Sequence, residues 1–339
     1  MLWVGSKNGI EADLVEREGI NFSSIPAAGV HGVNIKTLPG NLIKILSGIF
    51  ASKKVLRQFK PDVILFTGGY VAVPMALATG RIPKLLYVPD IEPGLALKFL
   101  SRSANQIAVT TKSSFQYFKD QTKLVVTGYP IRSGLKDRSA KNRQNKFTLS
   151  DKSPVLLFLG GSKGARSINT ALQKNLPRLL DRFQIIHITG QLDWDEIDNA
   201  RQDLPQTIKE RYHAFPYLHE EMGWALSSAD LVISRAGAST LGEYPYFNLP
   251  AVLVPYPHAW RYQKVNADYL KDHKAAIIIK DQELDNELFK TIMNLFDSPE
   301  TIEKMQKAMS DLAVPNAASN IARLLIGLSK NSIDQGVIK

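Results

Sequence analysis

The stretch VLLFLGGSKGARSIN, Val155 to Asn169, decides the fold of this chain. Five apolar residues lead directly into Gly160, Gly161 and Gly164, and a pattern typical of a helix follows. Such an unbroken apolar run is typical of a strand buried on both faces of a parallel sheet. Glycines at its end let backbone N–H groups approach a ligand, and the helix directs its positive dipole end to the same place. The spacing matches neither GxGxxG nor a P-loop. It leaves two interpretations open, a phosphate-binding turn or a tight turn without ligand.

Short runs rich in Val, Ile and Leu recur along the whole chain, with helix-like stretches between them. The expected strands are residues 2–4, 63–66, 85–88, 107–109 and 124–126, followed by 155–159, 185–188, 231–233, 251–254 and 276–279. Strands that alternate with helices form βαβ units and doubly wound parallel sheets. We therefore expect an α/β protein of two Rossmann-like domains that face each other across a cleft.

A second glycine turn, SRAGASTLGE, follows the expected strand at residues 231–233. Gly237 permits close backbone approach, and Ser239 and Thr240 suit the amino-terminus of a helix. The carboxylate of Glu243, about one turn further, could accept hydrogen bonds from both hydroxyls of a ribose. It could equally be a favourable charge on a first helical turn. Two such turns in one domain favour a nucleotide diphosphate as ligand.

The stretch PYPHAWRYQKVNADYL contains two amides that could read a sugar. Gln263 and Asn266 are three residues apart, which places them on one face of a helix. Amides donate and accept hydrogen bonds at once, as sugar hydroxyls do. Two solvent-exposed helix amides are the alternative.

Composition excludes several classes of site and suggests a partner for one half of the chain. The 339 residues contain no cysteine, so disulfides and thiolate metal sites are excluded, and we expect neither metal nor cofactor. The net charge is +10; residues 1–150 carry 21 Lys/Arg and 9 Asp/Glu, or +12, and the rest carries 21 and 23, or −2. A basic half suggests that this part of the chain binds an anionic membrane surface or a polyanion. The alternative is that the charge serves solubility alone.

The start of the chain has no signal-peptide pattern, and no apolar run is long enough to span a membrane. We therefore expect a cytoplasmic protein.

Several motifs together resemble the MurG family of GT-B glycosyltransferases. In the second half they are GGSKGARSIN, ISRAGASTLGE, PYPHAWRYQKVNADYL and VPNAASNIARLL; in the first half they are GSKNGIEADLVEREGI, KPDVILFTGGYVAVPMALA and VTGYPIR. The resemblance implies an inverting transferase that moves N-acetylglucosamine from UDP-GlcNAc to undecaprenyl-pyrophosphoryl-muramoyl-pentapeptide in peptidoglycan synthesis. It implies no nucleic-acid partner and a location on the inner face of the cell membrane.

The resemblance also implies roles for individual residues. Ser162 and the backbone around Gly237–Thr240 would contact the diphosphate, Glu243 the ribose and Gln263 the N-acetylglucosamine. Arg132 would steady the charge of the leaving UDP, and the loop around His219 would face the uracil. The complete set that we expect at UDP-GlcNAc is Arg132, Gly161, Ser162, Gly164, His219, Gly237, Ala238, Ser239, Thr240, Glu243, Gln263 and Asn266.

The sequence departs from the family pattern at two places. A first strand and a GGTGGH-type loop, which carries the family's histidine near the reacting centre, have no match, so we assign no catalytic base and expect little activity from the chain as given. Either the reading frame starts too late, which we favour, or another polypeptide supplies the loop. In YVPDIEPGLA, Asp90 stands where the family has asparagine, so a donor or acceptor contact changes there, because a carboxylate cannot donate as an amide does.

The expected organisation has five parts. Residues 1–135 form the acceptor and membrane-side domain, 136–152 a linker, 153–312 the UDP-sugar domain, 313–330 a helix that packs back toward the first domain, and 331–339 a tail. Residues 41–60, NLIKILSGIFASKKVLRQFK, predict an amphipathic helix that either binds anionic lipid or covers a sheet. The residues expected at a membrane are Leu42, Ile45, Ile49, Phe50, Lys53, Lys54 and Arg57.

Three functions remain open at this point. The first is transfer of N-acetylglucosamine to the lipid-linked muramoyl-pentapeptide. The second is a related GT-B transfer to another lipid or of another sugar. The third is an inactive nucleotide-sugar-binding or scaffold protein that lacks its catalytic loop.

Overall fold

A computed structural model describes residues 1–6, 11–29, 38–135, 147–150, 152–161, 164–257 and 262–336. The chain divides into two compact units, which are described separately. The first contains Met1–Pro89, Pro93–Thr127 and Ser319–Lys339, and the second contains Asp90–Glu92 and Gly128–Ala318, as far as these are described.

All strands of the first unit pair in parallel. They are β1 (Leu2–Ser6), β2 (Asn21–Ile25), β3 (Ile64–Phe66), β4 (Lys84–Val88), β5 (Gln106–Val109) and β6 (Leu124–Val126). β1 pairs with β2, and the other four form a sheet in the order β3-β4-β5-β6. The helices of this unit are α1 (Glu11–Arg17), α2 (Leu38–Phe59), α3 (Ala72–Ala78) and α4 (Leu95–Leu100), with the 3-10 helices η2 (Lys112–Tyr117) and η3 (Gln121–Lys123).

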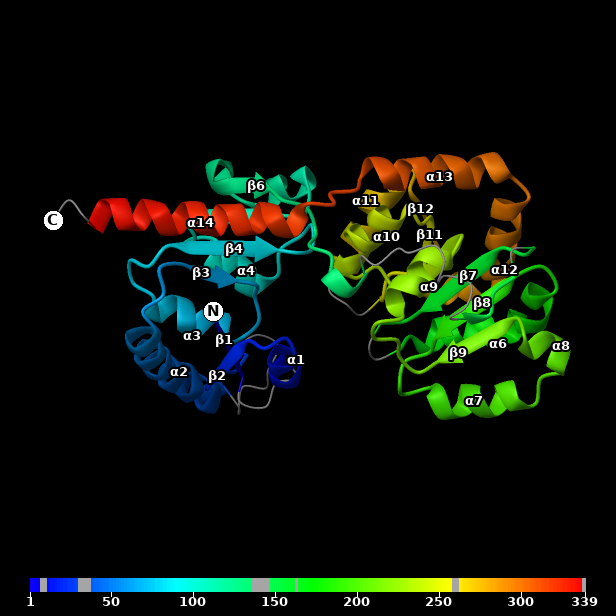
Figure 1. Ribbon diagram of the computed structural model, residues 1–339, viewed down its shortest axis with the longest axis horizontal. Helices are drawn as coiled ribbons and strands as arrows, with labels where there is room; N and C mark the ends of the chain where they lie inside the picture. Colours follow the sequence, from blue (N-terminus) through cyan, green and yellow to red (C-terminus); the bar gives the residue numbers. More distant parts are fainter. Residues whose placement is uncertain are drawn as a thin grey trace. The chain divides into compact units, whose positions relative to one another are not determined.

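Helices cover both faces of the four-stranded sheet. On one face Leu86, Val88, Ile107 and Val109 belong to a core against which Val55 of α2 packs. On the other, Leu85, Tyr87 and Ala108 pack against Ile321, Leu324, Leu325 and Leu328 of α14 (Ala317–Gly336). Figure 1 shows α14 running along this sheet. The final helix therefore completes the core of the first unit.

The second unit contains a six-stranded parallel sheet in the order β12-β11-β10-β7-β8-β9. Its strands are β7 (Val155–Leu159), β8 (Gln184–Ile188), β9 (Tyr212–Phe215), β10 (Leu231–Ser234), β11 (Ala251–Leu253) and β12 (Ala276–Ile278). Counted along the chain from β7, this is the order 6-5-4-1-2-3 of a doubly wound dinucleotide-binding sheet.

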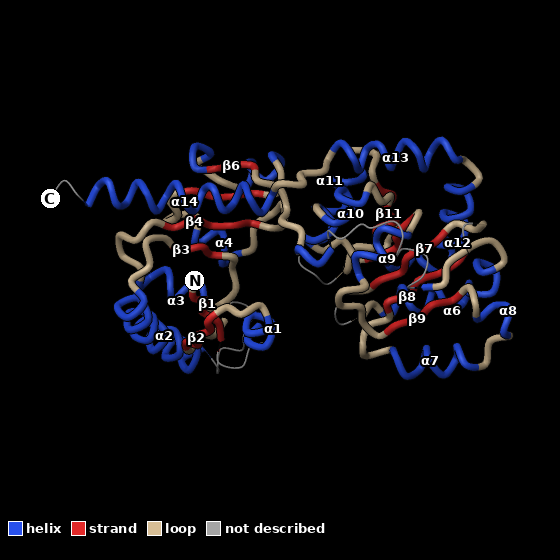
Figure 2. The backbone as a smooth tube through the Cα atoms, in the orientation of Figure 1, coloured by secondary structure: helices blue, strands red, loops and turns tan. Residues whose placement is uncertain are grey.

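Helices flank the six-stranded sheet, as Figure 2 shows. They are α6 (Arg166–Leu180), α7 (Trp194–Gln202), α8 (Gln206–Lys209), α9 (Met222–Ser228), α10 (Glu243–Phe247), α11 (Tyr262–Asp272), α12 (Leu284–Phe296) and α13 (Pro299–Asp311), with η4 (Ser133–Leu135), η5 (Ala238–Leu241) and η6 (Asp281–Glu283). Leu156 and Ile233 belong to a core shared with α6 and α12, and their neighbours Leu157 and Val232, which point to the opposite face, are also fully buried. Burial on both faces confirms the expected α/β class.

The ten expected strands are all present, and nine of them agree with the expected bounds within one residue at both ends. The exception is β1, which runs two residues further, to Ser6. Two further strands, β2 and β9, were not predicted. Both lie at the edge of their sheets, and their sequences NFSSI and YHAF mix polar with apolar residues. An edge strand lacks the unbroken apolar run that identifies a central strand.

The borders of the two compact units lie elsewhere than those expected for the domains. Gly128–Leu135 groups with the second unit, and Leu135 is buried beside Gly223. Within the expected linker, Phe147 is buried against Phe215 with an edge-to-face ring contact, while residues 136–146 lie outside the described part. Among the helices described, none is long and apolar enough to cross a membrane.

His187, in the centre of β8, should make the fold sensitive to acid. It is fully buried, and burial lowers its pKa to about 3 from a usual value near 6.5. Between these values the unfolded chain binds a proton that the folded chain does not, so the stability contributed here is complete above about pH 6.5 and falls below it by about 1.4 kcal/mol per pH unit.

Urea unfolding of the wild type and of His187→Gln between about pH 7 and about pH 5 measures this contribution. The loss of unfolding free energy with falling pH should be smaller in the variant. Parallel losses in the two proteins would mean that His187 is not the group responsible.

Candidate functional site

The two glycine turns begin side by side at the centre of the six-stranded sheet. β7 and β10 are hydrogen-bonded neighbours, and Leu159, the last residue of β7, pairs with Ser234, the last residue of β10. Gly160 and Arg235 therefore leave the same edge at adjacent positions. The connections from β7 and from β10 run outward in opposite directions, which makes this the switch point where doubly wound sheets bind ligands.

The first turn is shaped by glycines with different constraints. Gly161 and Gly164 have φ angles of +82° and +81°, and the N–H of Gly164 donates to the Gly161 carbonyl at 3.0 Å. A Cβ on Gly164 would overlap the carbonyl oxygen of Thr189, whereas a Cβ on Gly161 would meet nothing within 4 Å. The turn is thus packed against β8 on one side and open at Gly161. Ser162 lies outside the described residues.

The second turn forms a short 3-10 helix where a regular helix start was expected. Gly237 precedes η5, which begins at Ala238, and the hydroxyl of Thr240 donates to the Gly237 carbonyl at 2.7 Å. Thr240 is buried, so its side chain closes the turn. Ser239 donates its hydroxyl to the carboxylate of Glu243, the first residue of α10.

The carboxylate of Glu243 lies in a largely desolvated environment. Burial raises its pKa, while the positive charge of Arg132 and the hydrogen bond from Ser239 act in the opposite direction. Burial also raises the pKa of Tyr129 to about 12, and the charges of Glu243 and Asp90 add to this effect. Tyr129 is therefore the neutral centre of a cluster with two carboxylates and one exposed guanidinium, that of Arg132.

Asn266 is held entirely by protein groups. Its amide nitrogen donates to the Asp90 carboxylate at 2.8 Å and to the Ala236 carbonyl at 3.2 Å, and its oxygen accepts from the N–H of Ile91 at 3.2 Å. The side chain is completely buried. We therefore place Asn266 behind the site, where it fixes Asp90 beside the second turn, rather than in contact with a sugar.

Gln263, one turn earlier on α11, is positioned differently. Its side-chain oxygen accepts from the N–H of Tyr256 at 2.8 Å, and the side chain is half-buried. Within the described part of the chain the amide nitrogen makes no hydrogen bond, which suits it to a ligand. His219 is exposed beyond the end of β9, with its ring edge-on to Tyr217 at 4.6 Å.

Burial raises the pKa of Asp90, and the hydrogen bond from Asn266 lowers it in part. That hydrogen bond occupies Oδ1. Within the described residues no second hydrogen bond to the carboxylate is found, so Oδ2 can accept from a ligand.

Two polar networks around the start of α6 were not predicted from the sequence. One joins Asn169 to His187 and Asp193, and the other joins Ser167 to Arg235 and Asp281. The sequence offers only weak signs of these networks. One is a histidine inside the apolar run QIIHI, and the other is the presence of polar residues among the apolar ones of the helix that follows the first glycine turn.

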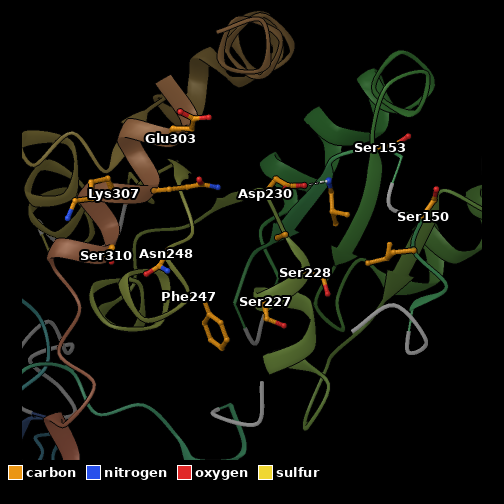
Figure 3. Close-up of a pocket in the computed structure, with 14 residues that line it drawn as sticks. Ser150, Ser153, Ser227, Ser228, Asp230, Phe247, Asn248, Glu303, Lys307 and Ser310 are labelled. Carbon is orange, nitrogen blue, oxygen red and sulfur yellow. Dashed lines mark hydrogen bonds between the residues drawn. The ribbon is translucent and has the colours of Figure 1, made fainter. Parts of the chain in front are cut away.

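A cavity of the second unit lies at the opposite edge of the sheet. It encloses about 820 Å³ near the start of β7 and of β10, where the carboxylate of Asp230 accepts from the N–H of Val155 at 2.8 Å. Figure 3 shows Ser227, Ser228, Glu303 and Lys307 around it. None of the predicted site residues lines this cavity, and parallel sheets bind ligands at the other edge. We therefore assign the site to the glycine turns.

The described residues contain no group of three or more His, Asp or Glu that could hold a metal ion.

Comparison with known proteins gives consistent matches along both units. Residues 1–109 match the glycosyltransferase family 28 N-terminal domain, and residues 155–321 match the family 28 C-terminal domain. A Roseiflexus protein named UDP-N-acetylglucosamine–N-acetylmuramyl-(pentapeptide) pyrophosphoryl-undecaprenol N-acetylglucosamine transferase is 39% identical over 96% of this chain and 82% of its own length. A Listeria welshimeri protein of the same name is 33% identical over 97% of this chain and 91% of its own length.

Among solved structures, the crystal structure of Acinetobacter baumannii MurG superposes with a TM-score of 0.70. It is 27% identical, and the match covers 96% of this chain and 90% of that one. The fold is thus that of the GT-B glycosyltransferases.

Two glycine substitutions should separate the roles of the first turn. Gly161→Ala should lower the free energy of unfolding by about 1–2 kcal/mol, the usual strain of a non-glycine residue at positive φ. Gly164→Ala should lower the free energy of unfolding clearly more, because its Cβ would overlap the Thr189 carbonyl in addition to the same backbone strain. Urea unfolding measures both, and equal losses would contradict the close approach of the turn to β8.

Proposed function

The chain belongs to glycosyltransferase family 28, and we propose that it transfers N-acetylglucosamine from UDP-GlcNAc to undecaprenyl-linked muramoyl-pentapeptide, with inversion at the anomeric carbon. The observation that carries this proposal is the 39% identity to a transferase of that name along 96% of the chain. The two glycine turns at the switch point support it, because they offer backbone donors to a diphosphate.

The donor would lie across the two turns of the second unit. The diphosphate would bind at Gly161 and along Gly237–Thr240, the ribose hydroxyls would donate to Glu243, and the amide of Gln263 would contact the sugar. The Glu243 carboxylate suits this role because Ser239 and Arg132 already orient and stabilise it. The loop around His219, which we expect to face the uracil, would complete the donor set.

The reaction is a single displacement. The acceptor hydroxyl oxygen attacks the anomeric carbon and loses its proton to a base, for which we assign no residue. The bond from this carbon to the β-phosphate oxygen breaks, and UDP leaves with the electron pair. Negative charge grows on the diphosphate as this bond breaks, so donors placed there stabilise the transition state more than the ground state. Arg132, exposed beside Glu243, is the cation that we place at this charge.

Asp90 supports a second candidate, a related GT-B transfer to another lipid. Its free Oδ2 accepts hydrogen bonds where the family's asparagine would donate one, so the group recognised here can differ. Supplying UDP-GlcNAc with either the lipid-linked muramoyl-pentapeptide or diacylglycerol separates the two candidates. Transfer to the former alone supports the main proposal. Binding of UDP without transfer to either favours an inactive nucleotide-sugar-binding protein.

A membrane-facing surface is the second part of the proposal, since a lipid-linked acceptor has to be reached at the bilayer. α2 carries an exposed stripe of apolar residues followed by basic ones: Leu42, Ile43, Leu46, Phe50, Lys53, Lys54 and Arg57. These recur every three or four residues and so share one side of the helix. Phe50 is 71% exposed, although it is among the largest apolar side chains.

The opposite side of α2 packs on the first unit. Val55 and Leu56 lie against its core, and the hydroxyl of the buried Ser52 donates to the Gly48 carbonyl within the helix. Ile45 and Ile49, which we expected at the membrane, are half-buried and belong to this inner side, whereas Ile43 joins the exposed stripe. Apolar side chains beside lysines suit an interfacial helix on anionic lipid. We therefore propose a peripheral location on the cytoplasmic face of the cell membrane.

Glu243→Ala should weaken UDP binding by about 1–3 kcal/mol, because two ribose hydroxyls lose a charged acceptor. Glu243→Gln keeps the shape but removes the charge, and it should fall between the wild type and the alanine variant. Calorimetric titration with UDP measures all three. The same affinity in the three proteins would rule out the ribose contact.

Charge reversal at Lys53, Lys54 and Arg57 to Glu should abolish binding to phosphatidylglycerol vesicles, because each basic residue contributes about 1 kcal/mol there. Wild-type binding should also weaken with salt. Cosedimentation at low salt measures both effects. The matched control reverses Lys290, Lys304 and Lys307, which are exposed on α12 and α13 of the second unit. If both triple variants sediment like the wild type, α2 is not a lipid-binding surface.

A further inference from the structure

The amino-terminal turn of α6 is held from two sides by polar networks, a buried one at Asn169 and a half-buried one at Ser167. Ser167 and Asn169 are two residues apart, and residues so spaced point to different sides of a helix. Each side chain begins a separate chain of hydrogen bonds to the ends of other strands. α6 begins at Arg166, two residues after Gly164, so whatever fixes its first turn also constrains the backbone of Gly164, whose N–H donates to the Gly161 carbonyl.

The network of Asn169 has a single consistent direction. Asn169 donates from its amide nitrogen to the Thr189 carbonyl at 2.9 Å and to Asp193 at 2.8 Å, so its oxygen faces His187. His187 therefore donates from Nε2 to that oxygen at 2.9 Å, and its Nδ1 accepts from the Tyr212 hydroxyl at 2.8 Å. Every hydrogen-bonding atom of the imidazole and the amide is thus satisfied.

This network ends at the glycine turn itself. The Thr189 carbonyl that accepts from Asn169 is also the group against which Gly164 packs. Asp193 in turn accepts from Arg166, the first residue of α6, at 3.0 Å. The network therefore fixes the distance between the end of β8 and the beginning of α6.

The network of Ser167 fixes the other side. The Ser167 hydroxyl donates to Asp281 at 2.7 Å and accepts from Arg235 at 2.8 Å, and Arg235 also pairs with Asp281 directly. Arg235 further donates to the Val254 carbonyl at 3.1 Å. Because Arg235 is the first residue of the second turn, this network ties the two glycine turns to each other.

Apolar packing alone would hold α6 on the sheet but would not fix its rotation. Ile168 and Leu172 already bury the helix in the core. Hydrophobic contacts are non-directional, whereas hydrogen bonds between buried groups specify one geometry and are costly to break singly. The arrangement has the form expected where a few backbone N–H groups have to point in a defined direction.

We propose that Ser167, Asn169, His187, Asp193, Arg235 and Asp281 are positioning residues for the donor diphosphate. They hold the backbone donors of the two glycine turns in the geometry that binds it, without touching the ligand themselves. This inference rests on the proposed function. It predicts that these side chains contribute to the affinity for UDP, which has a second phosphate, and much less to the affinity for UMP.

The test compares the affinities of the whole chain for UDP and for UMP by calorimetry. Asn169→Ala should lower the affinity for UDP by about tenfold and Ser167→Ala by about threefold, in line with the loss of one to a few hydrogen bonds in a positioning network. The affinity for UMP should change much less in both. Lys174→Ala is the matched control, because Lys174 lies on the same helix in an exposed pair with Asp285, and it should bind both nucleotides like the wild type.

Thermal unfolding of each variant accompanies the titrations. Ser167→Ala leaves the ion pair between Arg235 and Asp281 in place, so we expect this variant to fold. It can then test the inference even if Asn169→Ala does not fold. Unchanged UDP affinity in folded variants, or equal losses for UDP and UMP, would overturn the inference and leave the networks a role in folding only. A wild-type chain that binds no UDP would instead overturn the proposed donor site, and the inference with it.

Discussion

The pairing of Leu159 with Ser234 is the constraint on which the rest of the second unit depends. These residues end the two central strands in register, so both glycine turns start at one point of the sheet edge. A shift by two residues would separate the turns by roughly 7 Å, because a strand rises about 3.3 Å per residue. The burial of both faces of β7 and β10 opposes such a shift, since each strand residue already occupies a defined place in the core.

Electrostatics at this edge is arranged around carboxylates, although the proposed ligand is an anion. Glu243 and Asp90 are both desolvated, and their charges reinforce each other at Tyr129. A diphosphate bound beside them would be repelled unless opposite charge lay closer to it. In the proposed site, backbone N–H groups of the two turns and the exposed Arg132 would supply that charge. This explains why the carboxylates suit the hydroxyl-bearing parts of a nucleotide sugar, while the phosphates fall to glycines.

The sequence predicts the parts of the fold that rest on local pattern. Central strands such as β7 and β10 are identified by unbroken apolar runs, and the glycine turns follow from them. β2 and β9 were missed because edge strands tolerate polar residues on their open side. The pairing of Asn266 with Asp90 could not be predicted, because it joins residues 176 positions apart and no local pattern records such a contact. The networks of Ser167 and Asn169 were missed for the same reason.

The position of Asn266 also clarifies what the exchange of asparagine for aspartate at residue 90 alters. Asn266 donates to Oδ1 of Asp90, and an asparagine at this position could accept the same hydrogen bond through its own oxygen. The backbone beside it would remain fixed as well, because Asn266 accepts separately from the N–H of Ile91. The exchange therefore leaves the internal contact intact and acts only on the second atom of the side chain, an acceptor in place of a donor. In the proposed donor site, we therefore expect this departure from the family pattern to alter the hydrogen bond offered to a ligand, while the contacts of Asn266 with Asp90 and Ile91 stay in place.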